Sequence, residues 1–110
     1  MPTYVITRHD SRADGSGRLP AILMGAVQSP DHRAAVDFAH GQFVRSECQW
    51  VDAVKADKVK RSTFNRAMEI GVYVQCPDCG IVLVRPTVFL HVVGVAGLCP
   101  TCNAQLYFEE

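Results

Sequence analysis

The sequences CPDCG at positions 76–80 and CPTCN at positions 99–103 decide the fold of this chain. Each holds two cysteines separated by two residues, and two such pairs have the spacing of a closed, tetrahedral site of four thiolates, which is typical of structural zinc. Pro77 and Pro100 preset the first turn residue, and Gly80 and Asn103 are residue types that readily adopt a left-handed backbone. The sequence therefore predicts one structural zinc ion bound by four side chains: Cys76, Cys79, Cys99 and Cys102.

The region around these turns resembles a known family. Tandem Cys-Pro-X-Cys turns flanked by strand-forming residues resemble the zinc-ribbon class with rubredoxin-type knuckles, and the resemblance covers residues 72–110. It implies a small β ribbon folded around one metal ion. Iron in a rubredoxin-like site of four cysteines is the alternative metal. Because zinc ribbons occur in proteins of many functions, the resemblance implies a fold and a metal site rather than an activity.

The composition is that of a folded globular protein, with 110 residues, 48% of them apolar, and 11 basic residues against 11 acidic ones. A net charge of zero provides no general attraction to nucleic acid or to an anionic membrane. The apolar run at 81–98 is interrupted by Arg85 and Pro86 and is too short to span a bilayer. With no signal-peptide pattern and with cysteines in metal-type spacing, we expect a cytoplasmic protein (host cytoplasm if it is viral) without a membrane partner.

The first 71 residues predict a layer of strand, strand, helix, strand and helix. Strands are expected from Thr3 to Arg8 and from Pro20 to Val27. The turn-rich loop over 9–18 between them is either a solvated tip or a partner-contacting loop. A helix is expected to begin at the cap residue Ser29 and to end at Gly41. Its narrow apolar stripe consists of Ala34, Ala35, Phe38 and Ala39.

A third strand and a second helix complete this layer. Alternation predicts a strand from Phe43 to Val54 with one wet face, the other face holding Val44, Cys48, Trp50 and Val54. Cys48, the fifth cysteine, is therefore interpreted as a packing residue rather than a nucleophile. The second helix is expected to begin at Ser62, to stop at Gly71 and to bury Phe64, Ala67 and Met68.

The predicted fold class is therefore α+β. A small antiparallel sheet with one or two short helices occupies residues 1–71, and a C-terminal β zinc ribbon over 72–110 packs on it as one unit.

The sequence does not predict an enzyme. Four thiolates close the metal shell, whereas catalytic zinc keeps a position open for water. No phosphate loop, nucleophile elbow or paired-carboxylate motif is present, and the four histidines occupy no catalytic motif: His9, His32, His40 and His91.

The first functional hypothesis is a protein-binding module acting as a regulator or inhibitor. Residues 72–110 carry one basic residue, Arg85, and three acidic ones, Asp78, Glu109 and Glu110, which suits a basic protein groove better than phosphates. Surplus apolar side chains could cover a partner or a second copy of the chain: Val88, Phe89, Val92 and Val93. The chain also resembles, in style only, small phage-encoded proteins that block a host machine, here one that handles nucleic acid.

The alternative hypothesis is direct binding of DNA or RNA. Residues 55–66 hold five basic side chains and a single acidic one, Asp57. Clustered Lys and Arg before a short helix could grip phosphates, although a charge run of this kind is also typical of a solvated face. The candidate contacts are Lys55, Lys58, Lys60, Arg61 and Arg66.

Overall fold

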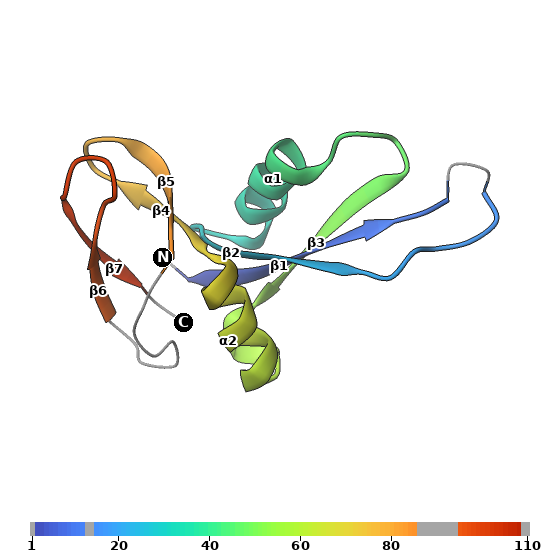
Figure 1. Cartoon of the computed structure of the whole chain (residues 1–110), viewed down its shortest axis with the longest axis horizontal. Coiled ribbons are helices and arrows are strands. Elements are labelled where there is room, and N and C mark those ends of the chain that lie inside the picture. Colours follow the sequence, from blue (N-terminus) through green and yellow to red (C-terminus); the bar gives the residue numbers. More distant parts are fainter. Residues whose placement is uncertain (1, 13–14, 86–94, 109–110) are drawn as a thin grey trace.

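The computed structural model describes residues 2–12, 15–85 and 95–108, and over these the fold is α+β. A five-stranded sheet has the order β3-β1-β2-β4-β5, and a two-stranded sheet holds β6 and β7 (Figure 1). The strands are β1 (Thr3–Asp10), β2 (Ile22–Gln28), β3 (Gln49–Lys55), β4 (Val72–Cys76), β5 (Gly80–Val84), β6 (Val95–Leu98) and β7 (Gln105–Phe108). The helices are α1 (His32–Phe43), α2 (Arg61–Ile70) and the short 3-10 helix η1 (Ala56–Lys58).

The larger sheet is mixed rather than purely antiparallel. β1 pairs antiparallel with β2 and with β3, and β4 pairs antiparallel with β5. β2 and β4 run parallel, and the backbone N–H of Ala26 donates to the carbonyl of Gly71 at their junction, 3.0 Å away. The hydrogen-bonded sheet therefore continues from the first 71 residues into the first cysteine hairpin.

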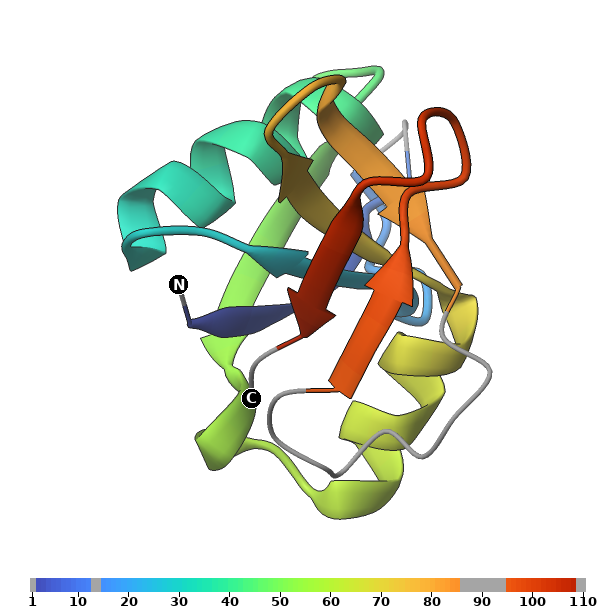
Figure 2. The same ribbon diagram turned by 90° about the vertical axis from the view of Figure 1, so that its left-hand side faces the viewer.

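Two apolar cores lie on opposite faces of this sheet, because successive residues of a strand point to opposite faces. α1 covers one face and α2 the other (Figure 2). The α1 core contains Tyr4, Ile6, Val27, Ala35, Ala39, Val51 and Ala53. The α2 core contains Val5, Ala26, Ala56, Phe64, Ala67, Met68, Val72, Val74, Cys76, Val84, Cys99 and Leu106.

Helix α1 differs from the prediction at both ends. Asp31, not the predicted Ser29, is the N-cap: its backbone is extended and its Oδ1 accepts a hydrogen bond of 2.8 Å from the N–H of Ala34. Ser29 is buried instead. The helix also continues past Gly41 to Phe43. The predicted stripe is confirmed in part, with Ala35 and Ala39 fully buried.

Strand β3 begins six residues later than predicted, and its two faces were assigned wrongly. Residues 44–48 form a loop that is held by the N–H of Arg45 donating to Oε1 of Gln49. Within the strand Val51 and Ala53 are buried against α1, while Val54 is exposed. Both faces of the sheet are partly covered, so alternation alone could not show which face of β3 points into the α1 core.

Helix α2 starts just before the predicted cap and otherwise agrees with the prediction. Its N-cap is Lys60 rather than Ser62, and no side chain caps it. The predicted apolar face is buried, and Gly71 ends the helix with φ of 145°. No helix among the described residues is long and apolar enough to cross a membrane.

The molecule is elongated, with extents of 46 × 28 × 22 Å, and a distinct structure occupies each end (Figure 1). At one end lies the ribbon, which we define as residues 72–85 and 95–108. At the other end the outer parts of β1, β2 and β3 project beyond the helices as the arm, defined as residues 7–12, 15–23 and 48–52.

Candidate metal centre

Four cysteine sulfurs meet at the tip of the ribbon. The sulfur of Cys76 lies 3.5 Å from that of Cys102, and the sulfur of Cys99 lies 3.9 Å from that of Cys79. All four sulfurs lie within 4.8 Å of one another. In a tetrahedral zinc–thiolate site, Zn–S bonds of about 2.3 Å place the sulfurs about 3.8 Å apart. The four side chains therefore fit one tetrahedral metal ion, as the spacing predicted.

Each pair of cysteines sits on a turn with the predicted local conformation. The first turn joins β4 to β5, and the second joins β6 to β7. Gly80 and Asn103 both adopt positive φ, 84° and 62°. In the second turn the N–H of Asn103 donates to the carbonyl of Cys99 at 2.9 Å, which closes the loop. The left-handed residue after each pair turns the chain back so that both sulfurs face one point.

The four ligands divide into a buried pair and an exposed pair. Cys76 and Cys99 have 0% exposure and belong to the α2 core, whereas Cys79 and Cys102 are exposed. All five cysteines of the chain are free thiols. The first cysteine of each turn thus anchors the site in the apolar core, and the second closes it from the solvent side.

Hydrogen bonding within the cluster divides the protons unequally among the thiols. The contact with the Cys102 sulfur, more than loss of water, raises the pKa of Cys79 to about 12. The backbone N–H of Cys102, helped by that of Thr101, outweighs loss of water and lowers the pKa of Cys99 to about 6. At Cys102 the N–H of Ala104 favours the thiolate, yet the net pKa is raised. The thiol of Cys99 therefore ionises readily while those of Cys79 and Cys102 keep their protons, and a divalent cation bound among the sulfurs would favour the thiolate form of all its ligands.

Comparisons of the chain with protein-family models, with curated proteins and with solved structures found no match. The metal centre is therefore supported by its own geometry. The arrangement of four cysteines is compatible with a zinc-ribbon-like knuckle, and the site can bind one metal ion.

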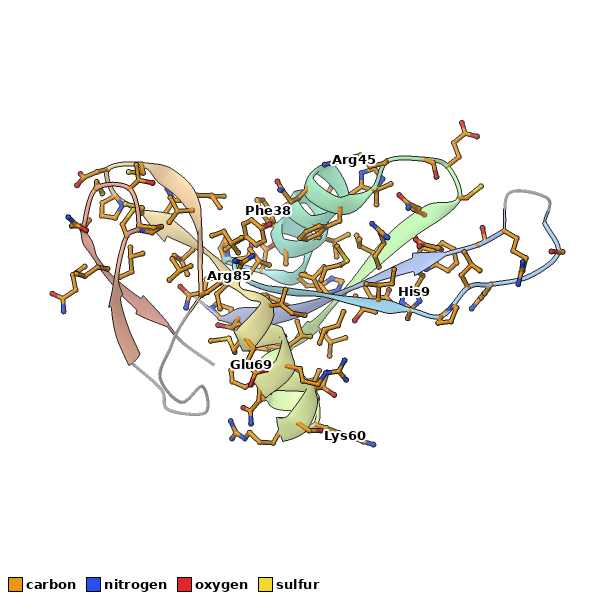
Figure 3. All side chains as sticks on the ribbon, in the orientation of Figure 1. His9, Phe38, Arg45, Lys60, Glu69 and Arg85 are labelled. Carbon is orange, nitrogen blue, oxygen red and sulfur yellow. The ribbon has the colours of Figure 1, made fainter. Side chains whose placement is uncertain are left out.

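The basic side chains singled out in the sequence lie in one continuous stretch. Residues 55–66, which we call the basic segment, run from the last residue of β3 through η1 into α2. All five predicted contacts are exposed: Lys55, Lys58, Lys60, Arg61 and Arg66. Figure 3 shows Lys60 at the end of α2 that points away from the sheet, on the side opposite to Arg45 and α1. The structure does not bring these residues near the cysteines.

Two other predictions have different outcomes. The four candidate interface residues, Val88, Phe89, Val92 and Val93, lie outside the described residues. Cys48 is half-buried in the loop before β3, and its carbonyl accepts hydrogen bonds from the N–H and the hydroxyl of Ser11. It lies apart from the metal cluster and belongs to neither apolar core.

Sequence reasoning missed a side-chain cluster on the arm. The rings of His9 and Trp50 stack with centroids 5.4 Å apart, and the guanidinium of Arg18 lies 5.5 Å from the Trp50 centroid. Nε2 of His9 is 2.6 Å from Oδ2 of Asp52. The only signal in the sequence was the strand-like alternation around Trp50. The partners come from segments about 40 residues apart in the chain, which pairing of β1 with β3 brings together.

Proposed function

We propose that this protein is a non-enzymatic zinc protein whose ribbon binds a protein partner. The observation that carries the proposal is apolar side chains exposed next to the metal centre. Ile81 is 50% exposed and Leu98 is 62% exposed, and Leu83 lies between Ile81 and the end of β5. Exposed apolar groups gathered on a rigid, metal-bound element are typical of a surface that binds another protein.

The charge of the ribbon supports a protein partner over a nucleic acid. Asp78 and Arg85 are the charged side chains among its described residues, and four thiolates around one divalent ion add a net charge of −2. Phosphate contacts need clustered cations, which this end of the molecule lacks. A partner with an apolar patch bordered by basic groups has the matching chemistry.

The same observations suggest the role of the metal. With four thiolates as ligands the shell is closed, so the ion would shape the docking surface and leave no position for substrate. In this proposal the chain acts in the cytoplasm as a regulator or inhibitor of the protein that it binds.

The test is affinity capture from a bacterial lysate with mass spectrometry, using the wild-type chain and two charge-introducing variants. The double variant Ile81→Asp with Leu98→Asp should lose a stoichiometric partner while keeping its metal. Leu19→Asp is the control, because Leu19 is an exposed apolar residue on the arm, with 41% exposure, and it should keep the partner. The absence of any stoichiometric partner of the wild-type chain would contradict the proposal.

A second candidate function is direct binding of nucleic acid through the basic segment. The observation that favours it is the solvent exposure of all five Lys and Arg side chains of that segment. Phosphate binding releases counterions, so the affinity should fall steeply as salt rises. Changing Lys58, Lys60 and Arg61 to Glu together should abolish it, and binding that is insensitive to salt would count against this candidate.

A further inference from the structure

The cluster on the arm is an aromatic surface outside both cores. Trp50 is half-buried, and it belongs to neither the α1 core nor the α2 core. His9 faces it across the β1–β3 pairing, in which the two residues are direct partners. The Trp50 ring therefore lacks much of the stabilisation that full burial in an apolar core would provide.

The cluster lies on the face of the sheet that α2 covers nearer the middle of the molecule. His9 has the same alternation along β1 as Val5, a member of the α2 core. Beyond α2 this face has no covering element among the described residues, as the arm in Figure 1 shows. The rings therefore form a platform with helix α2 rising beside it, while α1 lies on the opposite side.

Cations lie at both ends of the platform. Arg18 approaches Trp50 from the tip of the arm. In the other direction β3 leads from Trp50 to Lys55, five residues or about 17 Å of extended chain, where the basic segment begins. A carboxylate oxygen of Asp52 lies 2.6 Å from Nε2 of His9. Lys55 itself has the alternation of Val51 and Ala53 and belongs to the α1 side of the sheet, but the segment then continues to Lys60 at the far end of α2, on the side of the stacked rings.

We propose that this platform binds single-stranded nucleic acid, with a base stacking against the His9–Trp50 pair and phosphates contacting Arg18 and the basic segment. Unpaired bases offer the planar faces that aromatic rings bind, and the backbone supplies the anions that clustered Lys and Arg attract. A duplex hides its base faces, so the platform should favour single strands. The inference rests on the second candidate function above and gives it a specific site.

The chain provides its own reporter for this proposal, because Trp50 is its only tryptophan. The probe is a single-stranded oligothymidylate of about 16 nucleotides, titrated into the metal-loaded, full-length protein at low salt. We expect quenching of the Trp50 fluorescence that saturates, weakens as salt rises and is smaller with a duplex of equal length. Binding without any change in Trp50 emission would overturn the proposed site.

Two variants on the platform test it by fluorescence anisotropy of a labelled probe. Trp50→Ala should weaken binding about tenfold, as expected for loss of one base-stacking contact. Arg18→Gln removes an exposed guanidinium and should weaken binding several-fold. It keeps the proposal testable if the Trp50→Ala protein does not fold. Arg33→Gln is the matched control, because Arg33 is exposed on α1 at the opposite side of the sheet, and its affinity should equal that of the wild type.

The outcomes distinguish failure of the proposed platform from failure of nucleic-acid binding as such. If the triple change at Lys58, Lys60 and Arg61 abolishes binding but Trp50→Ala and Arg18→Gln do not weaken it, the protein binds nucleic acid elsewhere and the platform is refuted. If the wild-type protein binds no single strand at low salt, both ideas fail. A loss in Arg33→Gln as large as that in Arg18→Gln would show non-specific charge attraction and would also refute the platform.

Discussion

The ribbon and the arm are both β extensions at the ends of one sheet, yet different forces hold them. In the ribbon, two cysteine ligands lie in the apolar core and the four sulfurs surround a site for an ion. In the arm, Val51 joins the α1 core at the inner end, and farther out cross-strand pairing is supplemented by the Trp50 stack and the ion pair between Arg8 and Asp10. Ion pairs and cation–π contacts close to the surface, including a partly buried pair such as Arg8 with Asp10, contribute about 1 kcal/mol each, whereas metal binding contributes on the order of 10 kcal/mol.

Because different interactions stabilise the two ends, a change of metal content or pH should affect the ribbon and leave the arm folded. Removing the metal should disorder part of the ribbon and leave the arm in place, because the arm meets the core cluster of Cys76 and Cys99 only at its inner end, through Leu23. The following changes test that separation, beginning with the largest expected effect.

The change Cys99→Ser should abolish tight metal binding and unfold the β6–β7 hairpin, with a loss on the order of 5 kcal/mol or more in the free energy of unfolding. An isolated two-stranded hairpin is marginal in water. Metal analysis and amide hydrogen exchange should report these losses while the emission of Trp50 stays unchanged. Cys48→Ser is the control and should keep one ion per chain. A Cys99→Ser protein with full metal and an unchanged melting temperature would contradict the assignment.

Acidification should weaken metal binding at the ribbon without affecting the arm. Since the pKa values of Cys79 and Cys102 are raised, both thiols are protonated at neutral pH in the metal-free chain and must lose protons when the ion binds. The affinity should therefore fall at least about a hundredfold for each pH unit between pH 8 and 6.5. Below about pH 6 the thiol of Cys99 also becomes protonated, and the dependence should steepen. Competition with a chelator of known pH dependence measures this, and a flat profile would argue against thiolate ligands.

A smaller change should act at the joint between the sheet and the ribbon. The φ of 145° at Gly71 disfavours any side chain, and an added Cβ would also displace Cδ1 of the exposed Leu83, from which it would stand 2.6 Å. Gly71→Ala should therefore reduce the free energy of unfolding by about 2 kcal/mol or more.

The matched control for that change is another glycine, Gly41, which is exposed in helix α1 with nothing within 4 Å of an added Cβ. Gly41→Ala should stabilise the protein slightly, by about 0.5–1 kcal/mol. Chemical denaturation of both variants measures the contrast, and equal effects would mean that the tight packing at Gly71 is not a constraint.

The sequence predicted the metal site far better than the rest because that site is determined locally. Two cysteines separated by two residues and followed by a residue that tolerates positive φ favour this turn locally, and Gly80 and Asn103 both adopt positive φ. The apolar faces of α1 and α2 could also be predicted, because a helix repeats its buried face every three or four residues.

The predictions that were wrong or missing concerned contacts between segments that are distant in the sequence. The buried face of β3 could be assigned only with knowledge that helices cover both sides of the sheet, so that Val51 and Ala53 face α1. Ser29 was predicted to cap α1, but the N-cap is Asp31, two residues later, where the backbone is extended and the side chain accepts from the N–H of Ala34. The arm cluster requires the register that pairs His9 with Trp50, which no local pattern encodes.

The two cysteine turns differ in how their flanking strands are paired, and from this we infer which turn forms first. β4 and β5 belong to the five-stranded sheet, so the turn bearing Cys76 and Cys79 is braced by backbone hydrogen bonds before any ion arrives. Within the described part of the chain, β6 and β7 pair only with each other. We therefore expect the hairpin that carries Cys76 and Cys79 to form without the ion, and the second hairpin to dock on it when the ion binds.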